Sequence, residues 1–386
     1  MAPSQSVALV HHWLVARRGG ERCLDALAQL LPDADLFTLV HDAEVCPAPE
    51  GVARVTTSLV QRVPGGTSLF RALLPVFPWL FRRFDLSGYD AVVTSDASLA
   101  KCVTVPKGVP HVCLCYSPVR YAFDLRETYL RQRVPALLRP LARALLSRVR
   151  DTDREAAARV THFVAPSRHA AERIARAYDR DAKVVYPPVD TAFFTPGEPT
   201  DQAALVGTEP PWPADERPYL LLGQAVAYKR FDLAVAACAR LDRPLIVAGG
   251  GPLFDSLARA AGPSTVFVRR PSDAAVRDLY RSAKAVIFPG EEDFGLVPVE
   301  AMACGTPVVA LGVGGATETV VHGTTGLLYD GLTAADVERA LMAFEELAPD
   351  LDPNAAVARA ASFSLESHLR TMREVLIAAG VPVRKG

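Results

Sequence analysis

The chain has 386 residues, half of them apolar, and a formal net charge of −1. This length predicts two folded domains, and the composition excludes a disordered chain. The seven cysteines form no Cys-x-x-Cys pair and no apolar run reaches membrane-spanning length, so we expect buried thiols in a reducing, cytoplasmic compartment.

Short apolar runs alternate with amphipathic segments along the chain. We predict buried parallel strands, with helices between them, at residues 7–10, 36–40, 91–94, 111–115 and 163–166. The pattern stops near residue 186, and six prolines between 195 and 218 oppose a helix or a central strand there. It resumes with strands predicted at 219–222, 245–248, 266–268, 285–288 and 308–310.

This alternation predicts an α/β protein with two Rossmann-like, doubly wound domains that face a central cleft. We place the first domain at residues 1–195, a proline-rich linker at 196–217 and the second domain at 218–386. The last helix could pack back on the first domain. Ligands of such sheets bind at the carboxyl ends of the strands, so function is expected in the cleft.

Two carboxylates, Glu292 and Glu300, flank a glycine shortly after the strand predicted at 285–288. We predict a helix at 294–304, whose first turn would offer the N–H groups of Phe294, Gly295 and Leu296 to a ligand. Carboxylates here suit the vicinal hydroxyls of a sugar or a ribose better than a phosphate. The alternative interpretation is an ordinary cluster of negative charge at a helix N-terminus.

The run E-D-F-G-L-V-P-V-E-A-M-A-C-G-T-P-V-V, which starts at Glu292, resembles the E-x7-E signature of the retaining glycosyltransferases of family 4, which have the GT-B fold. The segment from Val10 to Glu21 is similar to the N-terminal loop of that family, and residues 228–234 to its phosphate-binding segment. The most similar subgroup is the mannosyltransferases of bacterial polysaccharide biosynthesis, many of which use GDP-mannose.

The resemblance implies metal-independent, retaining transfer of a hexose, with mannose favoured, from a nucleotide-diphosphate sugar to a hydroxyl acceptor. No cofactor and no metal are expected. It implies that Glu292 contacts the transferred sugar and that Lys229 neutralises the leaving diphosphate, which makes these two the catalytic candidates. The remaining donor-side candidates are Gly19, Gly20, Arg230, Gly250, Phe294, Gly295, Leu296 and Glu300, the last of which would contact the ribose. The acceptor-side candidates are His11, His12, Tyr116 and Arg120.

Several of these residues also have plain structural interpretations. Lys229 and Arg230 fit an exposed first helical turn, and Gly19–Gly20 fits an ordinary turn as well as a loop that uses positive φ against a phosphate. The chain departs from the family at Gln224, where an arginine is common, and at Tyr116, where a histidine is usual. A non-catalytic nucleotide-sugar-binding protein, and another GT-B enzyme such as a phosphorylase or an epimerase, therefore stay as alternatives.

Residues 62–150 contain 14 basic and 5 acidic residues, and two segments mix arginine with bulky apolar residues at helical spacing, 70–84 and 131–150. Such segments suit an anionic membrane surface or a lipid-linked acceptor, which would place the protein peripherally on the inner face of the membrane. In the alternative, the apolar side belongs to the core and the arginines are solvated. Nucleic acid is not an expected partner.

Overall fold

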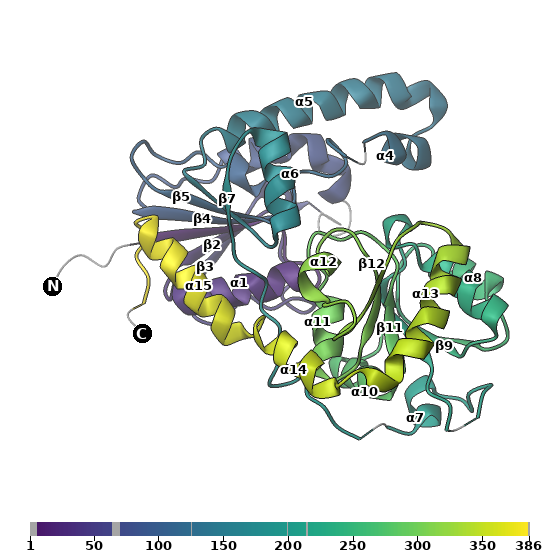
Figure 1. Cartoon of the computed structure of the whole chain (residues 1–386). Coiled ribbons are helices and arrows are strands. Elements are labelled where there is room, and N and C mark those ends of the chain that lie inside the picture. The colour runs from purple at the N-terminus through teal and green to yellow at the C-terminus, as the bar shows by residue number, and fades with distance from the viewer. Residues whose placement is uncertain (1–5, 64–69, 125, 199, 214, 385–386) are drawn as a thin grey trace. The chain divides into compact units, whose positions relative to one another are not determined.

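The computed structural model describes residues 6–63, 70–124, 126–198, 200–213 and 215–384. The chain forms two compact units (Figure 1). The first unit contains Met1–Pro188 together with Glu366–Gly386, and the second contains Val189–Leu365.

The first unit is built on a seven-stranded parallel sheet with the order β3-β2-β1-β4-β5-β6-β7. Its strands are β1 (Val7–His11), β2 (Asp35–Thr38), β3 (Arg54–Thr57), β4 (Ala91–Asp96), β5 (His111–Cys115), β6 (His162–Ala165) and β7 (Ala182–Val184). Its α-helices are α1 (Gly19–Leu30), α3 (Phe77–Arg82), α4 (Arg126–Arg133), α5 (Arg139–Ala157), α6 (Arg168–Tyr178) and α15 (Leu365–Ala378).

Apolar side chains cover both faces of this sheet, because successive residues of a strand point to opposite faces. Leu9 of β1 packs in a cluster with Leu24 of α1 and Leu376 of α15. Its neighbour Val10 packs in a second cluster with Phe77 of α3 and Val149 of α5. The C-terminal helix α15 therefore completes the core of the first unit, although more than 170 residues separate it from the rest of that unit in the sequence.

The second unit is built on a six-stranded parallel sheet with the order β10-β9-β8-β11-β12-β13. Its strands are β8 (Tyr219–Gln224), β9 (Leu245–Gly250), β10 (Thr265–Arg269), β11 (Ala285–Phe288), β12 (Val308–Leu311) and β13 (Gly326–Tyr329). Its α-helices are α7 (Gln202–Val206), α8 (Phe231–Leu241), α9 (Phe254–Ala260), α10 (Asp273–Ser282), α11 (Leu296–Ala303), α12 (Ala316–Thr319), α13 (Ala334–Leu347) and α14 (Pro353–Ala361).

The expected fold class, two Rossmann-like parallel-sheet domains, is confirmed, and each predicted strand is present within two residues of its expected ends. The sequence reasoning missed β3, β7 and β13, all of them short strands at sheet edges. An edge strand has one hydrogen-bonded neighbour and is partly exposed, so its apolar pattern is weak. Within the segment expected to be a linker, α7 forms where residues 200–209 contain no proline.

Short 3-10 helices complete the described structure: η1 (Leu59–Arg62), η2 (Phe70–Val76), η3 (Ala100–Cys102), η4 (Ala136–Leu138), η5 (Ala227–Lys229) and η6 (Ala348–Asp350). Within the described ranges, no helix combines the length and the apolar character needed to span a membrane. All seven cysteines are buried free thiols, as expected.

Candidate functional site

The predicted site residues lie beside the points where strand order reverses. In the first unit the order reverses between β1 and β4, and in the second between β8 and β11. A reversal leaves a crevice at the carboxyl ends of the two strands, which is the usual ligand position in open α/β sheets. His11 ends β1, and Lys229 and Glu292 follow β8 and β11. Each unit thus carries one group of candidates.

In the second unit the structure brings the two catalytic candidates together. The Nζ of Lys229 lies 2.7 Å from Oε1 of Glu292, and the two side chains are only 13% and 21% exposed. Lys229 ends the 3-10 helix η5 after β8, whereas Glu292 belongs to the loop after β11. A partly shielded ammonium next to a carboxylate can neutralise a diphosphate while the carboxylate accepts hydrogen bonds from sugar hydroxyls.

Close backbone contacts hold these two loops against each other. A Cβ on Gly290 would lie 2.5 Å from the Cα of Lys229, and a Cβ on Gly314 would lie 2.6 Å from the carbonyl oxygen of Glu292. Both distances are shorter than real Cβ contacts, so neither position has room for a side chain. These glycines therefore allow the loops that carry Lys229 and Glu292 to pack closely. They have a packing role in addition to any contact with a ligand.

The helix that follows Glu292 begins later than expected. We predicted helix from residue 294, but α11 begins at Leu296, because Gly295 has φ +83° and acts as the N-cap. Phe294 lies outside the helix and is buried, with its ring 5.6 Å from that of Phe363. Leu296 and the N-cap Gly295 are therefore at the helix start as expected, whereas the placement of Phe294 in the first turn is wrong.

Glu300, the predicted ribose partner, is buried on α11, and its Oε2 accepts a hydrogen bond of 2.8 Å from the hydroxyl of Tyr280. Tyr280 belongs to α10 and is fully buried. This contact fixes the orientation of the carboxylate. Sequence reasoning missed Tyr280, because an aromatic residue on the apolar face of an amphipathic helix gives only a core signal.

Arg230, Gly250 and Gln224 lie near the ends of β8 and β9. Arg230 has a left-handed backbone, with φ 50°, and its guanidinium donates to both carboxylate oxygens of Asp232 at 3.2 Å. Gln224 pairs in register with Gly250, and its Nε2 lies 4.0 Å from where a Cβ on Gly250 would be. A neutral amide therefore occupies the strand end where the family resemblance predicts an arginine.

In the first unit a chain of polar contacts links β1, β4, β5 and α1. The hydroxyl of Tyr116 donates to the carbonyl oxygen of Gly20 at 3.0 Å and bonds to Oγ of Ser95 at 2.8 Å. Oγ of Ser95 also bonds to Nδ1 of His11 at 2.9 Å, and Nε2 of His11 lies 3.5 Å from Oε1 of Glu21. This chain of polar contacts begins at Gly20 and ends at Glu21, both in the first turn of α1.

The carbonyl of Gly20 can only accept, so Tyr116 donates to it, Ser95 donates to Tyr116, and Nδ1 of His11 donates to Ser95. Nε2 of His11 faces the carboxylate of Glu21. Burial raises the pKa of Tyr116 well above its ordinary value, which keeps the phenol protonated and able to donate. Sequence reasoning missed Ser95, since a lone serine at a strand end carries no recognisable pattern.

The other candidates of this unit have plain positions. His12 is buried, its Nδ1 lies 3.3 Å from the carbonyl oxygen of Ser95, and burial together with the nearby His11 lowers its pKa to about 3. Gly19 and Gly20 form the first turn of α1 and neither has positive φ, so the expected positive-φ loop is wrong. Arg120 is half-buried in the segment after β5, four residues beyond Tyr116.

One group within the described part of the chain has the spacing of metal ligands. The ligand atoms of His11, His12 and Glu21 all lie within 4.8 Å of one another. Asp-x-Asp pairs occur at 33–35, 151–153, 179–181 and 350–352, and none of these aspartates joins such a group. The expectation of metal-independent chemistry stays a prediction.

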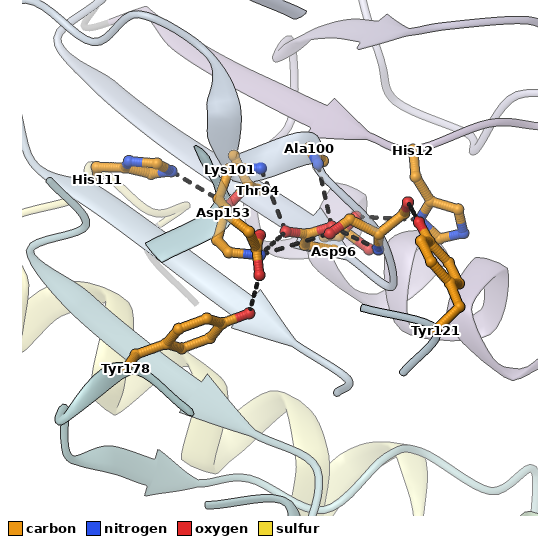
Figure 2. Close-up of polar contacts among 11 residues, drawn as sticks. His12, Thr94, Asp96, Ala100, Lys101, His111, Tyr121, Asp153 and Tyr178 are labelled. Atoms are coloured by element: carbon orange, nitrogen blue, oxygen red, sulfur yellow. Dashed lines mark hydrogen bonds and ion pairs between the residues drawn. The ribbon is translucent and has the colours of Figure 1, made fainter. Parts of the chain in front are cut away.

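Directly beyond Ser95 lies a buried charge network that sequence reasoning also missed (Figure 2). Nζ of Lys101 lies 3.0 Å from Oδ2 of Asp96 and 2.6 Å from Oδ1 of Asp153, and all three side chains are almost fully buried. The hydroxyl of Tyr178 donates to the other oxygen of Asp153 at 2.6 Å. Burial alone would raise the pKa of Asp96, but Lys101 and backbone N–H groups outweigh burial and lower it. The network anchors the end of β4, which carries Ser95.

Comparison with known proteins agrees with this architecture. Residues 17–193 match the family described as Glycosyltransferase Family 4, and residues 208–360 match the family described as Glycosyl transferases group 1. The chain therefore has the GT-B fold, with a family 4-like first part and a group 1-like second part. This supports the family resemblance at its coarser level, without the GDP-mannose subgroup.

Among curated relatives, D-inositol 3-phosphate glycosyltransferase of Mycobacterium sp. (strain JLS) is 34% identical over 193 residues. That match covers 47% of this chain and 43% of the relative, so it spans less than half of each protein. The same enzyme of Mycobacterium bovis (strain BCG / Pasteur 1173P2) is 37% identical over 160 residues, which is 38% of this chain and 32% of the relative.

Solved structures resemble this protein over nearly its whole length. Sucrose-phosphate synthase from Thermosynechococcus elongatus has a TM-score of 0.68 and 20% identity, covering 97% of this chain and 100% of that one. Anabaena HepE, solved with UDP-glucose, has a TM-score of 0.66 and 18% identity, covering 96% and 99%. At these identities the likeness establishes the fold alone.

Proposed function

We propose that the chain is a retaining, metal-independent glycosyltransferase that moves a hexose from a nucleotide-diphosphate sugar to a hydroxyl acceptor. The observation that carries the proposal is the contact between Lys229 and Glu292 at the strand reversal of the second unit, 2.7 Å between Nζ and Oε1. These residue types provide one group for the diphosphate and one for the sugar. The two family matches, both to glycosyltransferases, support the reaction class.

In the proposed reaction the bond between the anomeric carbon and the diphosphate oxygen breaks, and a bond from the acceptor oxygen to that carbon forms on the same face. The acceptor proton passes to the leaving diphosphate oxygen. Lys229 stabilises the charge that grows on the diphosphate, Glu292 orients the sugar through its hydroxyls, and Glu300 contacts the ribose. Tyr280 is a positioning residue, because it holds the carboxylate of Glu300.

The candidates for the donor's sugar and nucleobase rest on the family resemblance and on the relatives and solved structures that resemble this chain. The similarity to the mannosyltransferase subgroup favours mannose with a guanosine donor, whereas HepE was solved with UDP and UDP-glucose, so uridine donors are the second candidates. Curated relatives named for an inositol phosphate make an anionic polyol a reasonable acceptor, for which Arg120 offers a positive charge. A lipid-linked acceptor is the other candidate that the basic residues 62–150 support.

A donor screen tests the proposal. The purified chain is melted with GDP-, UDP-, ADP- and dTDP-sugars, since a ligand that binds the folded state raises the melting temperature. The donor that stabilises most is then incubated with and without EDTA, and release of nucleoside diphosphate is measured. We expect release that EDTA does not reduce. Loss of release on EDTA treatment, restored by a divalent cation, would contradict the metal-independent mechanism.

The same experiment separates the alternatives. A non-catalytic binding protein would be stabilised by a donor but would release no diphosphate with any hydroxyl acceptor. A phosphorylase would form a sugar phosphate only when inorganic phosphate is added. An epimerase would convert the donor into its isomer without releasing diphosphate.

A further inference from the structure

The basic region of the first unit contains two different kinds of surface. In residues 70–84, Phe77 and Phe81 are buried in the core, whereas Leu73, Val76 and Trp79 are 38%, 41% and 51% exposed, so the core interpretation holds for only part of that segment. The segment that runs from α4 through η4 into α5 is different (Figure 1). Four of its leucines are exposed.

Four leucines form an apolar stripe along η4 and the first half of α5. Their exposed fractions are 95% for Leu137, 53% for Leu138, 71% for Leu141 and 42% for Leu145. Leu141 and Leu145 are four apart in α5, so they lie on one side of consecutive turns, and Leu137 and Leu138 belong to η4, which directly precedes α5. α5 meets the core through other residues, including Leu146 and Val149, which are buried.

The surroundings of this leucine stripe are strongly basic. Residues 126–150 contain seven arginines and one acidic residue, although the whole chain has a net charge of −1. Of these arginines, Arg143 and Arg148 are exposed on the same helix as Leu141 and Leu145. Glu127 forms an ion pair with Arg143, 2.9 Å between Oε2 and Nη2. With 3.6 residues per turn, Arg148 lies on the same side of α5 as Leu141 and Leu145, whereas Arg143 lies on the opposite side. The segment as a whole keeps an excess of positive charge.

We propose that the leucine stripe of η4 and α5 docks on a bilayer surface that contains anionic phospholipids. Exposed leucines can enter the boundary between headgroups and acyl chains, while the bordering arginines bind the phosphates. The charge argues against a second copy of this chain, because two such surfaces would repel each other. Four leucines also make a narrower patch than the roughly 800 Å² per partner of a stable protein interface.

This docking is independent of the donor, and it would bring the proposed transferase to acceptors held in a membrane. The test uses the full chain in sedimentation with phosphatidylcholine vesicles, with or without phosphatidylglycerol. We expect binding to the anionic vesicles only, weakened by raised salt. A variant with Leu137→Gln, Leu141→Gln and Leu145→Gln should bind about tenfold more weakly or worse. Arg143→Gln with Arg148→Gln should weaken binding about tenfold at low salt and less at high salt.

A matched control carries Val45→Gln, Leu332→Gln and Ile377→Gln, three apolar residues outside the stripe that are 57%, 56% and 57% exposed. We expect this control to bind vesicles like the parent. Equal binding to neutral and anionic vesicles, or undiminished binding by the leucine variant, would overturn the proposal. The proposal would also be overturned if the parent formed dimers and did not bind vesicles while the leucine variant stayed monomeric. No donor is present in this assay, so its failure is distinct from failure of the proposed reaction.

Discussion

The hydroxyl of Tyr116 donates to the carbonyl oxygen of Gly20 at 3.0 Å, which ties the end of β5 to the first turn of α1. We had expected this hydroxyl to face an acceptor. In the structure this hydroxyl belongs to the series of polar contacts that continues through Ser95 and His11 to Glu21. Tyr116 therefore positions the first turn of α1, and any effect on the acceptor is transmitted through that turn.

Removing the hydroxyl of Tyr116 should lower the stability of the first unit and weaken acceptor binding. Tyr116→Phe should destabilise the first unit by about 1 kcal/mol and raise the KM of the acceptor, because Ser95 and Gly20 each lose a buried partner. Ser95→Ala should have a similar effect, and the double variant should lose less than the sum of the two. Tyr129→Phe, on an exposed tyrosine, is the control. Strict additivity in urea unfolding would show that the two hydroxyls do not act together.

Nucleotide binding should depend on Glu300 and, through it, on Tyr280. Glu300→Ala should weaken nucleotide binding by about 1.5–3 kcal/mol, the usual range for a hydrogen bond to a charged group. Tyr280→Phe should weaken it in the same direction by a smaller amount, because the carboxylate stays but loses its fixed orientation. Tyr329→Phe removes a buried hydroxyl that has no hydrogen-bond partner in the described structure, and should leave affinity unchanged. Isothermal titration of the four proteins measures this. Unchanged affinity in Glu300→Ala would rule out the ribose contact.

The buried network should matter for stability more than any exposed ion pair. Lys101→Met leaves Asp96 and Asp153 buried without a counter-ion and should cost about 3–5 kcal/mol of the free energy of unfolding. Lys107→Met, at an exposed lysine, should change it by less than about 0.5 kcal/mol. Urea unfolding monitored by tryptophan fluorescence compares them. If both variants have the same free energy of unfolding, the ion pairs of Lys101 make no net contribution to stability.

Buried histidines should make the first unit less stable in mild acid. Burial lowers the pKa of both His12 and His111 to about 3, so below their ordinary value of 6.5 the unfolded chain binds more protons than the folded one. Stability is therefore present above pH 6.5 and is lost as pH falls toward 3, by about 1.4 kcal/mol per pH unit for each histidine. Between pH 7 and pH 5, His111→Gln should lose about half as much stability as the parent. An equal loss in both proteins would exclude His111 as a cause.

The sequence allowed the α/β class and the central strands to be predicted, because strands buried on both faces leave continuous apolar runs such as residues 285–288. The family resemblance of two separate segments also made Lys229 and Glu292 candidates for one site, and their side chains are in contact in the structure. The sequence could not reveal Tyr280 or Lys101, because Tyr280 donates to Glu300, 20 residues further on, and Lys101 pairs with Asp153, 52 residues further on. Nor could it show that Leu141 is exposed while Leu146 is buried, since both fit the same helical pattern.

The central claim is that Lys229 and Glu292 form the reaction centre of a glycosyltransferase. Its most direct test is the single-turnover release of nucleoside diphosphate from the best donor by the parent, Lys229→Ala, Glu292→Gln and the control Arg240→Gln, an exposed arginine of α8 that pairs with Glu338. We predict that Lys229→Ala slows release at least about 30-fold, equivalent to about 2 kcal/mol, and that Glu292→Gln slows it while nucleotide affinity is retained. Arg240→Gln should stay close to the parent. Release by Lys229→Ala within about threefold of the parent rate would contradict the account.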